Sequence, residues 1–188
     1  TLAGSSSGFA NGTGTAAKFY YPYGVGNDAN NVYVADYLNH RIRKIVKSTG
    51  VVTTLAGSGS SGSTNATGTS ATFKYPMGVT SVGNYLYVTD RHNHKIRKIV
   101  KSTGVVTTFA GSGSSGSTNA TGTSAKFYYP WDITNDGKNL YIGDGHNHRI
   151  RKIVIATGVV STFAGSSYGY LDGNGTSAKF SYPYGVST

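Results

Sequence analysis

The sequence has no cysteine, no glutamate and no long apolar run. The absence of cysteine excludes disulfide scaffolds, iron–sulfur clusters, thiolate zinc sites and cysteine nucleophiles. A membrane helix needs about 20 apolar residues in a row, so no segment is predicted to span a bilayer. Acid–base chemistry would depend on seven acidic residues, all aspartate, and five histidines. We find no catalytic arrangement among them and predict that the chain is not an enzyme and has no cofactor.

Small and aromatic residues dominate what is present. Among 188 residues there are 27 glycines and 15 tyrosines, and only 13% of the residues are charged. This composition favours short strands joined by polar turns. The net charge of +10 indicates either a polyanionic partner or a solvated basic rim. The chain begins at Thr1 without a signal sequence, so we expect a mature or excised segment.

Internal repeats set the architecture. Two phrases recur with a period of 53 to 54 residues, a Thr-(Leu/Phe)-Ala-Gly phrase and a Tyr-Pro pair. The first starts at Thr1, Thr54, Thr108 and Thr162, and the second at Tyr21, Tyr75, Tyr129 and Tyr182. A fixed period of this length is typical of solenoids and propellers.

Each repeat carries four strand signals separated by turn residues. In the first repeat they lie around residues 24–25 and at 32–35, 41–46 and 51–56. The second of these is apolar on both faces, which indicates a strand covered on both sides. Ile42 and Ile45 are three residues apart, which predicts either a bulge or a lysine stem lying over apolar surface. Four short antiparallel strands at a fixed period predict a propeller blade.

A further phrase carries a family resemblance. Asp-x-x-Asn-His-(Arg/Lys)-Ile, after an aromatic-Val strand and before Val-Val-(Thr/Ser)-Thr-(Leu/Phe)-Ala-Gly, occurs three times and resembles the NHL-repeat β-propellers. The resemblance covers essentially the whole chain. It implies an all-β fold of four-stranded antiparallel blades from NHL-type repeats of about 54 residues, about three and a half of them, within a larger ring or an open repeat array.

The whole chain, 1–188, is then one propeller segment. Residues 1–21 supply the last strand of a preceding blade and a connector, 22–75, 76–129 and 130–182 form three blades, and 183–188 begin the next. Fourteen strands in this order do not close a ring, because propellers have four to eight complete blades. Exposed blade faces and edges need a neighbour, so we expect self-association or continuation of a repeat array.

The connector of each repeat is rich in Gly, Ser and Thr and should lie on the surface. Each copy carries one N-glycosylation sequon, at Asn11, Asn65, Asn119 and Asn174. The fourth is informative, because Asp172 takes the place of Asn119 and a sequon reappears two residues later. The sequons predict covalent N-glycans if the chain passes through a secretory pathway.

The Asp-x-x-Asn-His phrase follows the second strand of each repeat. Its aspartate can accept hydrogen bonds from the following turn, so we predict a structural turn, with a ring of carboxylates as the alternative. The predicted turn residues are Asp36, Asn39, His40, Asp90, Asn93, His94, Asp144, Asn147 and His148. Although His92 and His146 add imidazoles, no third ligand of fixed geometry accompanies them, and we predict no metal site.

Basic residues follow each of these turns. They are Arg41, Arg43, Lys44, Lys95, Arg97, Lys98, Arg149, Arg151 and Lys152. Stacked blades would align them into a basic stripe that binds an acidic polysaccharide or RNA; the alternative is a solvated face. RNA is less favoured, because the tyrosine positions suit packing better than base stacking. The aromatic residues before each Tyr-Pro pair are predicted to pack, with carbohydrate stacking as an alternative.

Three functions follow from these patterns. The first is a non-enzymatic extracellular or cell-surface structural and assembly protein with N-glycosylated connectors. The second is a binding propeller with a basic face. The third is a metal-dependent lyase, which the family resemblance allows but for which no channel ligands can be placed.

Overall fold

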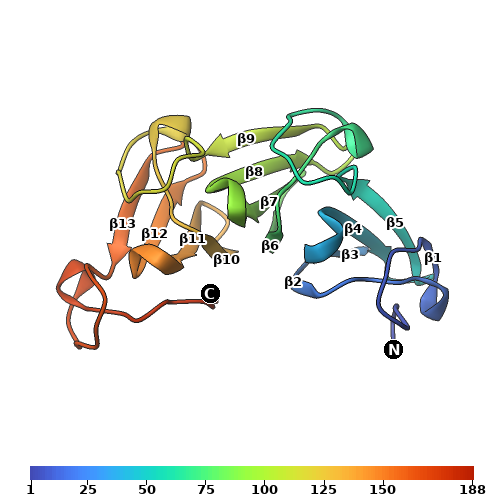
Figure 1. Cartoon of the computed structure of the whole chain (residues 1–188), viewed down its shortest axis with the longest axis horizontal. Coiled ribbons are helices and arrows are strands. Elements are labelled where there is room, and N and C mark those ends of the chain that lie inside the picture. Colours follow the sequence, from blue (N-terminus) through green and yellow to red (C-terminus); the bar gives the residue numbers. More distant parts are fainter. The chain divides into compact units, whose positions relative to one another are not determined.

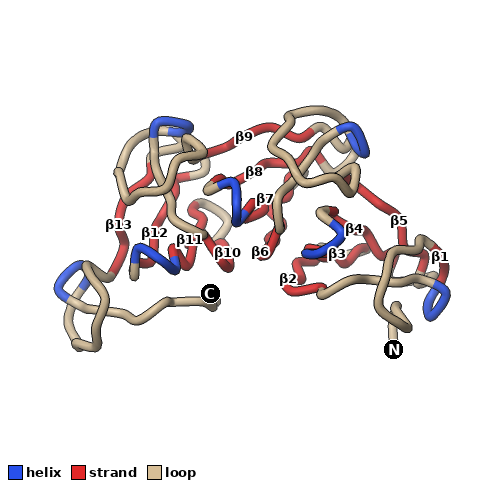
Figure 2. Tube along the Cα trace, in the orientation of Figure 1, coloured by secondary structure: helices blue, strands red, loops and turns tan.

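The computed structural model describes every residue from Thr1 to Thr188 and consists of strands, loops and single turns of 3-10 helix (Figures 1 and 2). No helix is long and apolar enough to cross a membrane. The strands form three antiparallel sheets, as the repeat predicts.

The first sheet has the order β1-β5-β4-β3-β2. Its strands are β1 (Gly12–Thr13), β2 (Pro22–Asn27), β3 (Asn31–Asp36), β4 (Arg41–Val46) and β5 (Val51–Ala56). Strand β1 belongs to the connector and extends the predicted four-stranded blade by pairing with β5, with Gly12 opposite Val52. The predicted bulge between Ile42 and Ile45 is not found in β4, which keeps a continuous register with β3. The register shift lies in β5, where Leu55 is the extra residue, and Ile42 and Ile45 pack into the core clusters on opposite faces of the sheet.

The other two sheets have four strands each, in the orders β6-β7-β8-β9 and β10-β11-β12-β13. The strands are β6 (Pro76–Val82), β7 (Tyr85–Asp90), β8 (Lys95–Val100), β9 (Val106–Ala110), β10 (Pro130–Asn135), β11 (Asn139–Asp144), β12 (Arg149–Val154) and β13 (Val160–Ala164). Sequence order equals spatial order, which is the meander expected of a propeller blade.

Short 3-10 turns fall at two places in each repeat. One set lies in the connectors, at η1 (Gly14–Ala16), η3 (Gly68–Ser70), η5 (Gly122–Ser124) and η7 (Gly175–Ser177). The other set lies in the Asp-x-x-Asn-His phrase, at η2 (Tyr37–Asn39), η4 (Arg91–Asn93) and η6 (Gly145–Asn147).

The two ends, which the sequence assigns to a preceding and a following blade, do not pair as strands with any segment of this chain. No strand is formed by residues 1–4 or by residues 184–188. A strand is defined by ladder hydrogen bonds to a neighbour, and these residues have the sequence of a strand without a pairing strand beside them.

The chain divides into two compact units. Unit 1 comprises Thr1–Val88 and Lys98–Thr107, and unit 2 comprises Thr89–Arg97 and Thr108–Thr188. In unit 1 one core joins Tyr33 and Ala35 of β3 to Leu86 and Val88 of β7. Val34, on the opposite face of β3, belongs to a second cluster. The second strand is therefore covered on both faces, as its sequence predicts.

Inner strands of unit 1 approach each other closely. A Cβ atom at Gly24 would lie 2.2 Å from the carbonyl oxygen of Met77, and one at Gly26 would lie 2.6 Å from that of Val79. Since real Cβ atoms do not approach backbone so closely, β2 must carry glycine wherever it faces β6.

Unit 2 has its own core around the third sheet. Leu140, Ile142 and Ile153 are fully buried on the paired strands β11 and β12. Phe127, from the preceding connector, is also fully buried.

Candidate functional site

A fully buried arginine organises the first blade. The guanidinium of Arg43 donates to Oδ2 of Asp36 at 2.8 Å and to Oδ1 of Asn11 at 2.8 Å. It also donates to the carbonyl oxygens of Lys18 and Ala10. One side chain therefore ties strand β4 to strand β3 and to the connector that precedes the blade.

Unit 2 repeats this network. Arg151 donates to Asp144 at 2.8 Å and to Oδ1 of Asn119 at 2.7 Å. Arg97 and Asp90 form the same buried ion pair at 2.7 Å. The sequence prediction placed Arg43, Arg97 and Arg151 on a polyanion-binding face, and this is wrong for these three: their side chains are 0% exposed.

The recurring aspartate accepts its backbone hydrogen bond from a different segment than the one predicted. Oδ1 of Asp36 accepts the backbone N–H of Tyr20, which lies in the preceding connector, not in the following turn. Its Oδ2 accepts the side-chain amide of Asn39, which also donates to the carbonyl of Gly8. The phrase is thus a turn that is tied to the connector.

The histidine of the phrase acts as an acceptor. His40 adopts the left-handed conformation with φ of 54°, and its Nδ1 accepts the N–H of Tyr75 at 3.1 Å. In unit 2, His94 and His148 accept the N–H groups of Tyr129 and Tyr182 in the same way. Burial, together with the charges of Arg41 and Lys74, lowers the pKa of His40, which keeps Nδ1 free to accept.

The buried arginines also explain why the connector asparagines recur. Asn11 and Asn119 are exposed residues, yet their Oδ1 atoms are acceptors for Arg43 and Arg151. Asp172 stands at the equivalent place in the last connector and accepts no hydrogen bond from an arginine of this chain. Asn174 is the residue before η7, the place that Thr121 has before η5. The fourth sequon therefore does not lie at the position of the asparagine that accepts the arginine.

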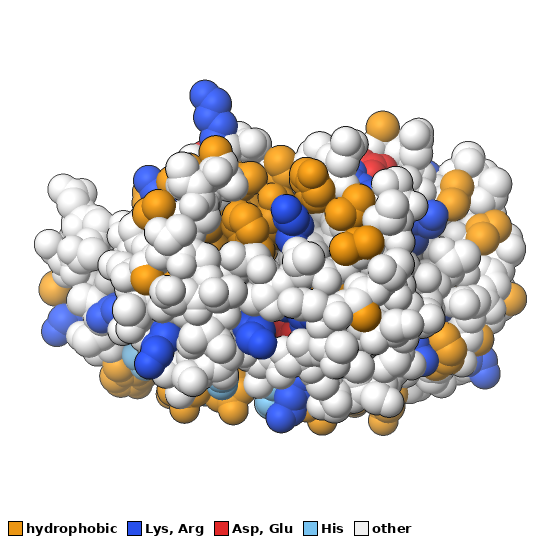
Figure 3. Space-filling view, turned by 90° about the horizontal axis from the view of Figure 1, so that it is seen from above, with side chains coloured by type: hydrophobic (Ala, Val, Ile, Leu, Met, Phe, Trp, Pro, Cys, Tyr) orange, Lys and Arg blue, Asp and Glu red, His pale blue; other side chains and the backbone are white.

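The remaining basic residues differ in their surroundings. Arg41 stacks 3.8 Å from the ring centre of Phe9, and Arg149 donates to the carbonyl of Ser166. Lys44, Lys95, Lys98 and Lys152 are partly exposed. On the face drawn in Figure 3, lysine and arginine side chains form separate spots with very little aspartate among them.

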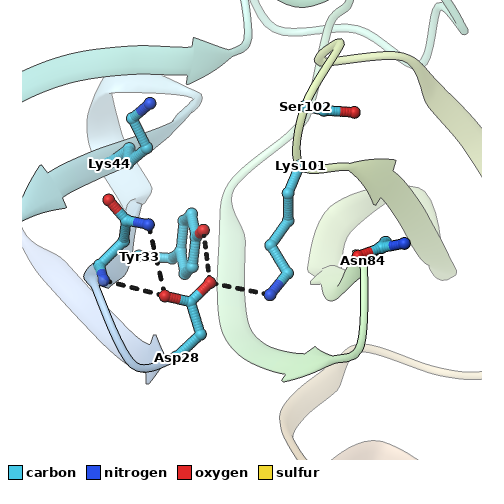
Figure 4. Close-up of a pocket in the computed structure, with 7 residues that line it drawn as sticks. Asp28, Tyr33, Lys44, Asn84, Lys101 and Ser102 are labelled. Carbon is cyan, nitrogen blue, oxygen red and sulfur yellow. Dashed lines mark hydrogen bonds and ion pairs between the residues drawn. The ribbon is translucent and has the colours of Figure 1, made fainter.

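A polar cavity of about 280 Å³ lies in unit 1 and was not predicted from the sequence (Figure 4). Asp28 accepts from Lys101 at 2.8 Å and from the Tyr33 hydroxyl at 2.9 Å. The amine of Lys44 points away from this group in Figure 4. The sequence did carry one sign of this carboxylate. Asp136 occupies the same turn in the third repeat, where it accepts the backbone N–H of Asn139.

Ionisation in this cavity is fixed by its hydrogen bonds. Burial alone would raise the pKa of the Asp28 carboxyl, but the bonds from Lys101, Tyr33 and the Asn31 backbone outweigh it and hold that pKa well below its usual range. Burial and Asp28 in turn raise the pKa of the Tyr33 hydroxyl. Asp28 is therefore a carboxylate and Tyr33 a neutral donor at neutral pH.

Unit 2 carries a group of aromatic rings around one arginine, which we call the aromatic–histidine surface. It consists of Arg91, Tyr129, Trp131, His146, Tyr182 and Tyr184. The guanidinium of Arg91 lies 4.3 Å from the ring centre of Trp131 and 4.8 Å from that of Tyr129. Tyr182 and Tyr184 remain 37% and 49% exposed, so part of this surface faces solvent.

Two further contacts complete the surface. Trp131 and Tyr184 have ring centres 4.0 Å apart, and His146 lies 5.2 Å from Tyr182. Burial, with the charges of Arg91 and His148, lowers the pKa of His146. The imidazole is thus neutral at neutral pH, and its Nδ1 has no hydrogen-bond partner.

Comparison with known proteins gives relatives in sequence. No protein-family model matches the chain. NHL repeat-containing protein 2 of Bos taurus is 32% identical over 144 residues, which is 70% of this chain and 20% of that protein. Protein SUPPRESSOR OF QUENCHING 1, chloroplastic, of Arabidopsis thaliana is 31% identical over 95% of this chain and 19% of its own length. The chain thus spans about a fifth of these relatives.

Solved structures agree in fold. A protein of unknown function from Bacteroides thetaiotaomicron is 26% identical with a TM-score of 0.70, covering 87% of this chain and 41% of its own. An auxiliary nutrient binding protein from Bacteroides ovatus has a TM-score of 0.71 at 20% identity, over 90% of this chain and 43% of its own. With the repeated phrase, the three sheets and these relatives, the chain belongs to the NHL-repeat family of β-propeller proteins.

Proposed function

We propose that the chain is a non-catalytic binding module whose aromatic–histidine surface binds carbohydrate. The observation that carries this proposal is the row of partly exposed rings in unit 2, formed by Trp131, Tyr182 and Tyr184. Binding sites combine aromatic surface with a few polar groups that orient the ligand. Here the rings offer flat apolar faces, and the tyrosine hydroxyls offer hydrogen bonds at their edges.

The non-catalytic part of the proposal comes from how the acids and histidines are used. Three aspartates form ion pairs with buried arginines, namely Asp36, Asp90 and Asp144. Two others, Asp28 and Asp136, accept backbone N–H groups in turns. Three of the five histidines accept backbone N–H groups. General acid–base catalysis needs a titratable group within reach of a substrate, and few such groups are left.

A sugar suits this surface better than a charged ligand does. A pyranose presents a face of C–H groups that packs on aromatic rings, and its hydroxyls bond to polar edges. The positive charge of Arg91 is already covered by two rings. The neutral state of His146 adds no charge to the surface. The auxiliary nutrient binding protein found among the solved structures is consistent with a binding role.

We further propose that the protein acts outside the cell or at its surface and carries N-glycans. Asn174 supports this, because it is exposed and makes no side-chain capping bond at η7. The recurrence of Asn11 and Asn119 carries less weight, since the arginine network accounts for it.

Trp131 provides the test, because it is the single tryptophan of the chain. Titration with neutral oligosaccharides should change its fluorescence saturably. Tyr184→Ala removes the ring that stacks on Trp131 and should weaken binding about tenfold, as loss of an aromatic anchor does. Tyr85→Ala, which removes a 39% exposed tyrosine of unit 1, serves as the control and should leave affinity unchanged.

Two outcomes would reject the carbohydrate site. One is an unchanged tryptophan spectrum across a panel of neutral oligosaccharides at millimolar concentration. The other is an equal loss of affinity for Tyr184→Ala and Tyr85→Ala, which would place the ligand elsewhere.

A second candidate ligand is an acidic polysaccharide. It is favoured by the cavity of unit 1, in which Lys44 accompanies the amides of Asn31 and Asn84 and makes no ion pair.

A further inference from the structure

The polar cavity of unit 1 is formed where two blades meet. The first blade contributes the turn between β2 and β3 and residues of β3 and β4, and the second blade contributes the β6–β7 turn and the turn after β8. The lining residues are Asp28, Asn31, Tyr33, Lys44, Asn84, Lys101 and Ser102, all of them in unit 1. Every one of these side chains is polar, so the cavity suits a polar ligand.

Asp28, the acid of the cavity, is already saturated with hydrogen bonds. Its Oδ2 accepts from the amine of Lys101 at 2.8 Å and from the hydroxyl of Tyr33 at 2.9 Å. Its Oδ1 accepts the backbone N–H groups of Asn30 and Asn31 at 3.1 and 2.9 Å, and the side-chain amide of Asn31 at 3.3 Å. A carboxylate has about four acceptor positions, so this one has none left for a ligand.

The groups that remain are a cation and hydrogen-bond donors. Lys44 makes no ion pair or hydrogen bond, and its amine points away from the Asp28 group in Figure 4. The side chains of Asn84 and Ser102 are exposed and make no hydrogen bond. The charged residues that line the cavity are two lysines and one aspartate, so one positive charge is not balanced.

This combination of charges occurs once among the repeats. In the second repeat Val82 takes the place of Asp28, and in the third repeat Ile155 takes the place of Lys101. A lysine stands at the place of Lys44 in every repeat. The lysine is thus a general feature of the repeat, whereas the ion pair beside it is specific to the cavity of unit 1.

We propose that this cavity binds one sugar residue that carries a single negative charge, as a carboxylate or a sulfate ester. The site rests on the acidic polysaccharide given above as the second candidate ligand, and it identifies the part of that ligand which the protein recognises. The negative group would lie at Lys44, where a charge-assisted hydrogen bond is stronger than a neutral one. The sugar hydroxyls would bond to Asn84 and Ser102.

Volume and charge limit the ligand. Sites for drug-sized ligands have about 300–1,000 Å³, and this cavity has about 280 Å³, which suits a single sugar residue. A phosphate monoester carries about 1.5 to 2 negative charges at neutral pH, more than one unbalanced lysine neutralises. A carboxylate or a sulfate ester carries one.

Isothermal titration calorimetry with glucuronate, glucose 6-sulfate and glucose tests the site. Both acidic sugars should bind saturably. Lys44→Gln should weaken their binding at least about tenfold, because a hydrogen bond to a charged group is lost. Lys44→Arg keeps the charge and should retain most of the affinity. Glucose, which has no charge, should show no dependence on Lys44.

Lys152→Gln is the matched control. It removes the same charge from the equivalent position of the third repeat, where Ile155 stands in place of the second lysine. The affinity for glucuronate should not change. Tryptophan fluorescence reports binding at the aromatic–histidine surface separately, because Trp131 is the single tryptophan of the chain.

A hexasaccharide of alternating glucuronate and N-acetylglucosamine distinguishes two sources of the ligand. Binding tighter than that of free glucuronate assigns the cavity to a residue within a polysaccharide. Equal binding assigns it to a free sugar acid. In both cases Lys44→Gln should weaken the binding at least about tenfold.

The site is rejected by any of three results: no saturable binding of either acidic sugar at millimolar concentration, equal losses of affinity for Lys44→Gln and Lys152→Gln, or an affinity for glucose that Lys44→Gln lowers as much as that for glucuronate. If the free sugars do not bind while loss of the strand lysines still weakens retention on heparin, the cavity site fails and the acidic polysaccharide remains the second candidate ligand.

Discussion

Each buried arginine serves as a hub at which three segments meet. The four terminal N–H groups of Arg43 go to Asp36, Asn11 and two backbone carbonyls, and only its Nε has no acceptor. Removing charge from water costs several kcal/mol per ion unless hydrogen bonds satisfy it. The connector thus gains its fixed path from hydrogen bonds, since its own side chains are mostly small.

Loss of one partner should be costly. Arg151→Met would leave the Asp144 carboxylate buried without its cation, and we expect the free energy of unfolding to fall by about 3–5 kcal/mol. Arg149→Met, on the same strand, removes one hydrogen bond of a partly exposed side chain and should cost less than about 1.5 kcal/mol. Urea denaturation of both variants measures the difference in the free energy of unfolding. Equal losses would contradict the role of the buried arginine as the residue that holds the three segments together.

The histidines make stability depend on pH. The pKa of His40 is lowered by burial, so the unfolded chain binds the proton more tightly. Its contribution to stability is present above the unfolded pKa and is lost as pH falls through the folded pKa. Protonation of Nδ1 also removes the acceptor of the Tyr75 N–H.

We therefore expect Tm to fall as pH is lowered from about 7.5 to about 5.5, in the range where histidine titrates. His40→Asn offers a matched control, because asparagine tolerates the left-handed conformation and keeps an acceptor oxygen without titrating. Its Tm should vary less with pH. A pH profile identical to that of the unmodified chain would show that His40 is not responsible.

At the scale of elements, the residues that the inner strand β2 can carry depend on how closely strand β6 approaches it. The phrase Tyr-Pro-Tyr-Gly-Val occurs at residues 21–25 and again at 182–186. In the first copy Gly24 lies against the backbone of Met77, whereas no atom lies within 4 Å of a Cβ at Gly185 in the second. The same phrase is thus under different constraints in its two places.

This gives a comparison within one sequence motif. Gly24→Ala should lower the free energy of unfolding by about 1–3 kcal/mol, because backbone must move to admit the methyl group. Gly185→Ala should change it by less than about 0.5 kcal/mol. Denaturant unfolding at low protein concentration checks both values. A neutral Gly24→Ala would mean that β2 and β6 are not packed as described.

At the scale of the whole molecule, the net charge of +10 is not evenly available to a partner. Arg43, Arg97 and Arg151 are buried against aspartates, so each pair contributes little to the surface. The predicted basic residues that remain partly exposed are Arg41, Arg149 and the lysines, among which Lys44 lines the cavity of unit 1.

Elution from heparin, an acidic polysaccharide, tests whether particular exposed lysines bind polyanions. Replacing Lys44, Lys98 and Lys152 with glutamine should lower the salt concentration needed to elute the chain from heparin, because each cation lost removes a counterion-releasing contact. A control with the same charge change replaces the connector residues Lys18, Lys126 and Lys179. If both triple variants elute alike, binding reflects net charge alone and the lysines of β4, β8 and β12 have no special role.

The repeat and the four strands of each blade were determined by the sequence itself. These features come from the period of apolar residues and from turn residues that are neighbours along the chain. The recurring Asp-x-x-Asn-His turn could be predicted for the same reason, although the donor to its aspartate could not.

The tertiary structure alone decided which charges are buried and which rings gather. Arg43 and Lys44 are adjacent and both basic, yet the alternation of β4 sends one into a network with Asn11 and leaves the other partly exposed. Arg91, Trp131 and Tyr184 meet only because segments far apart in sequence pack together. The end segments did not form strands, because a strand exists only where another strand completes its hydrogen bonds.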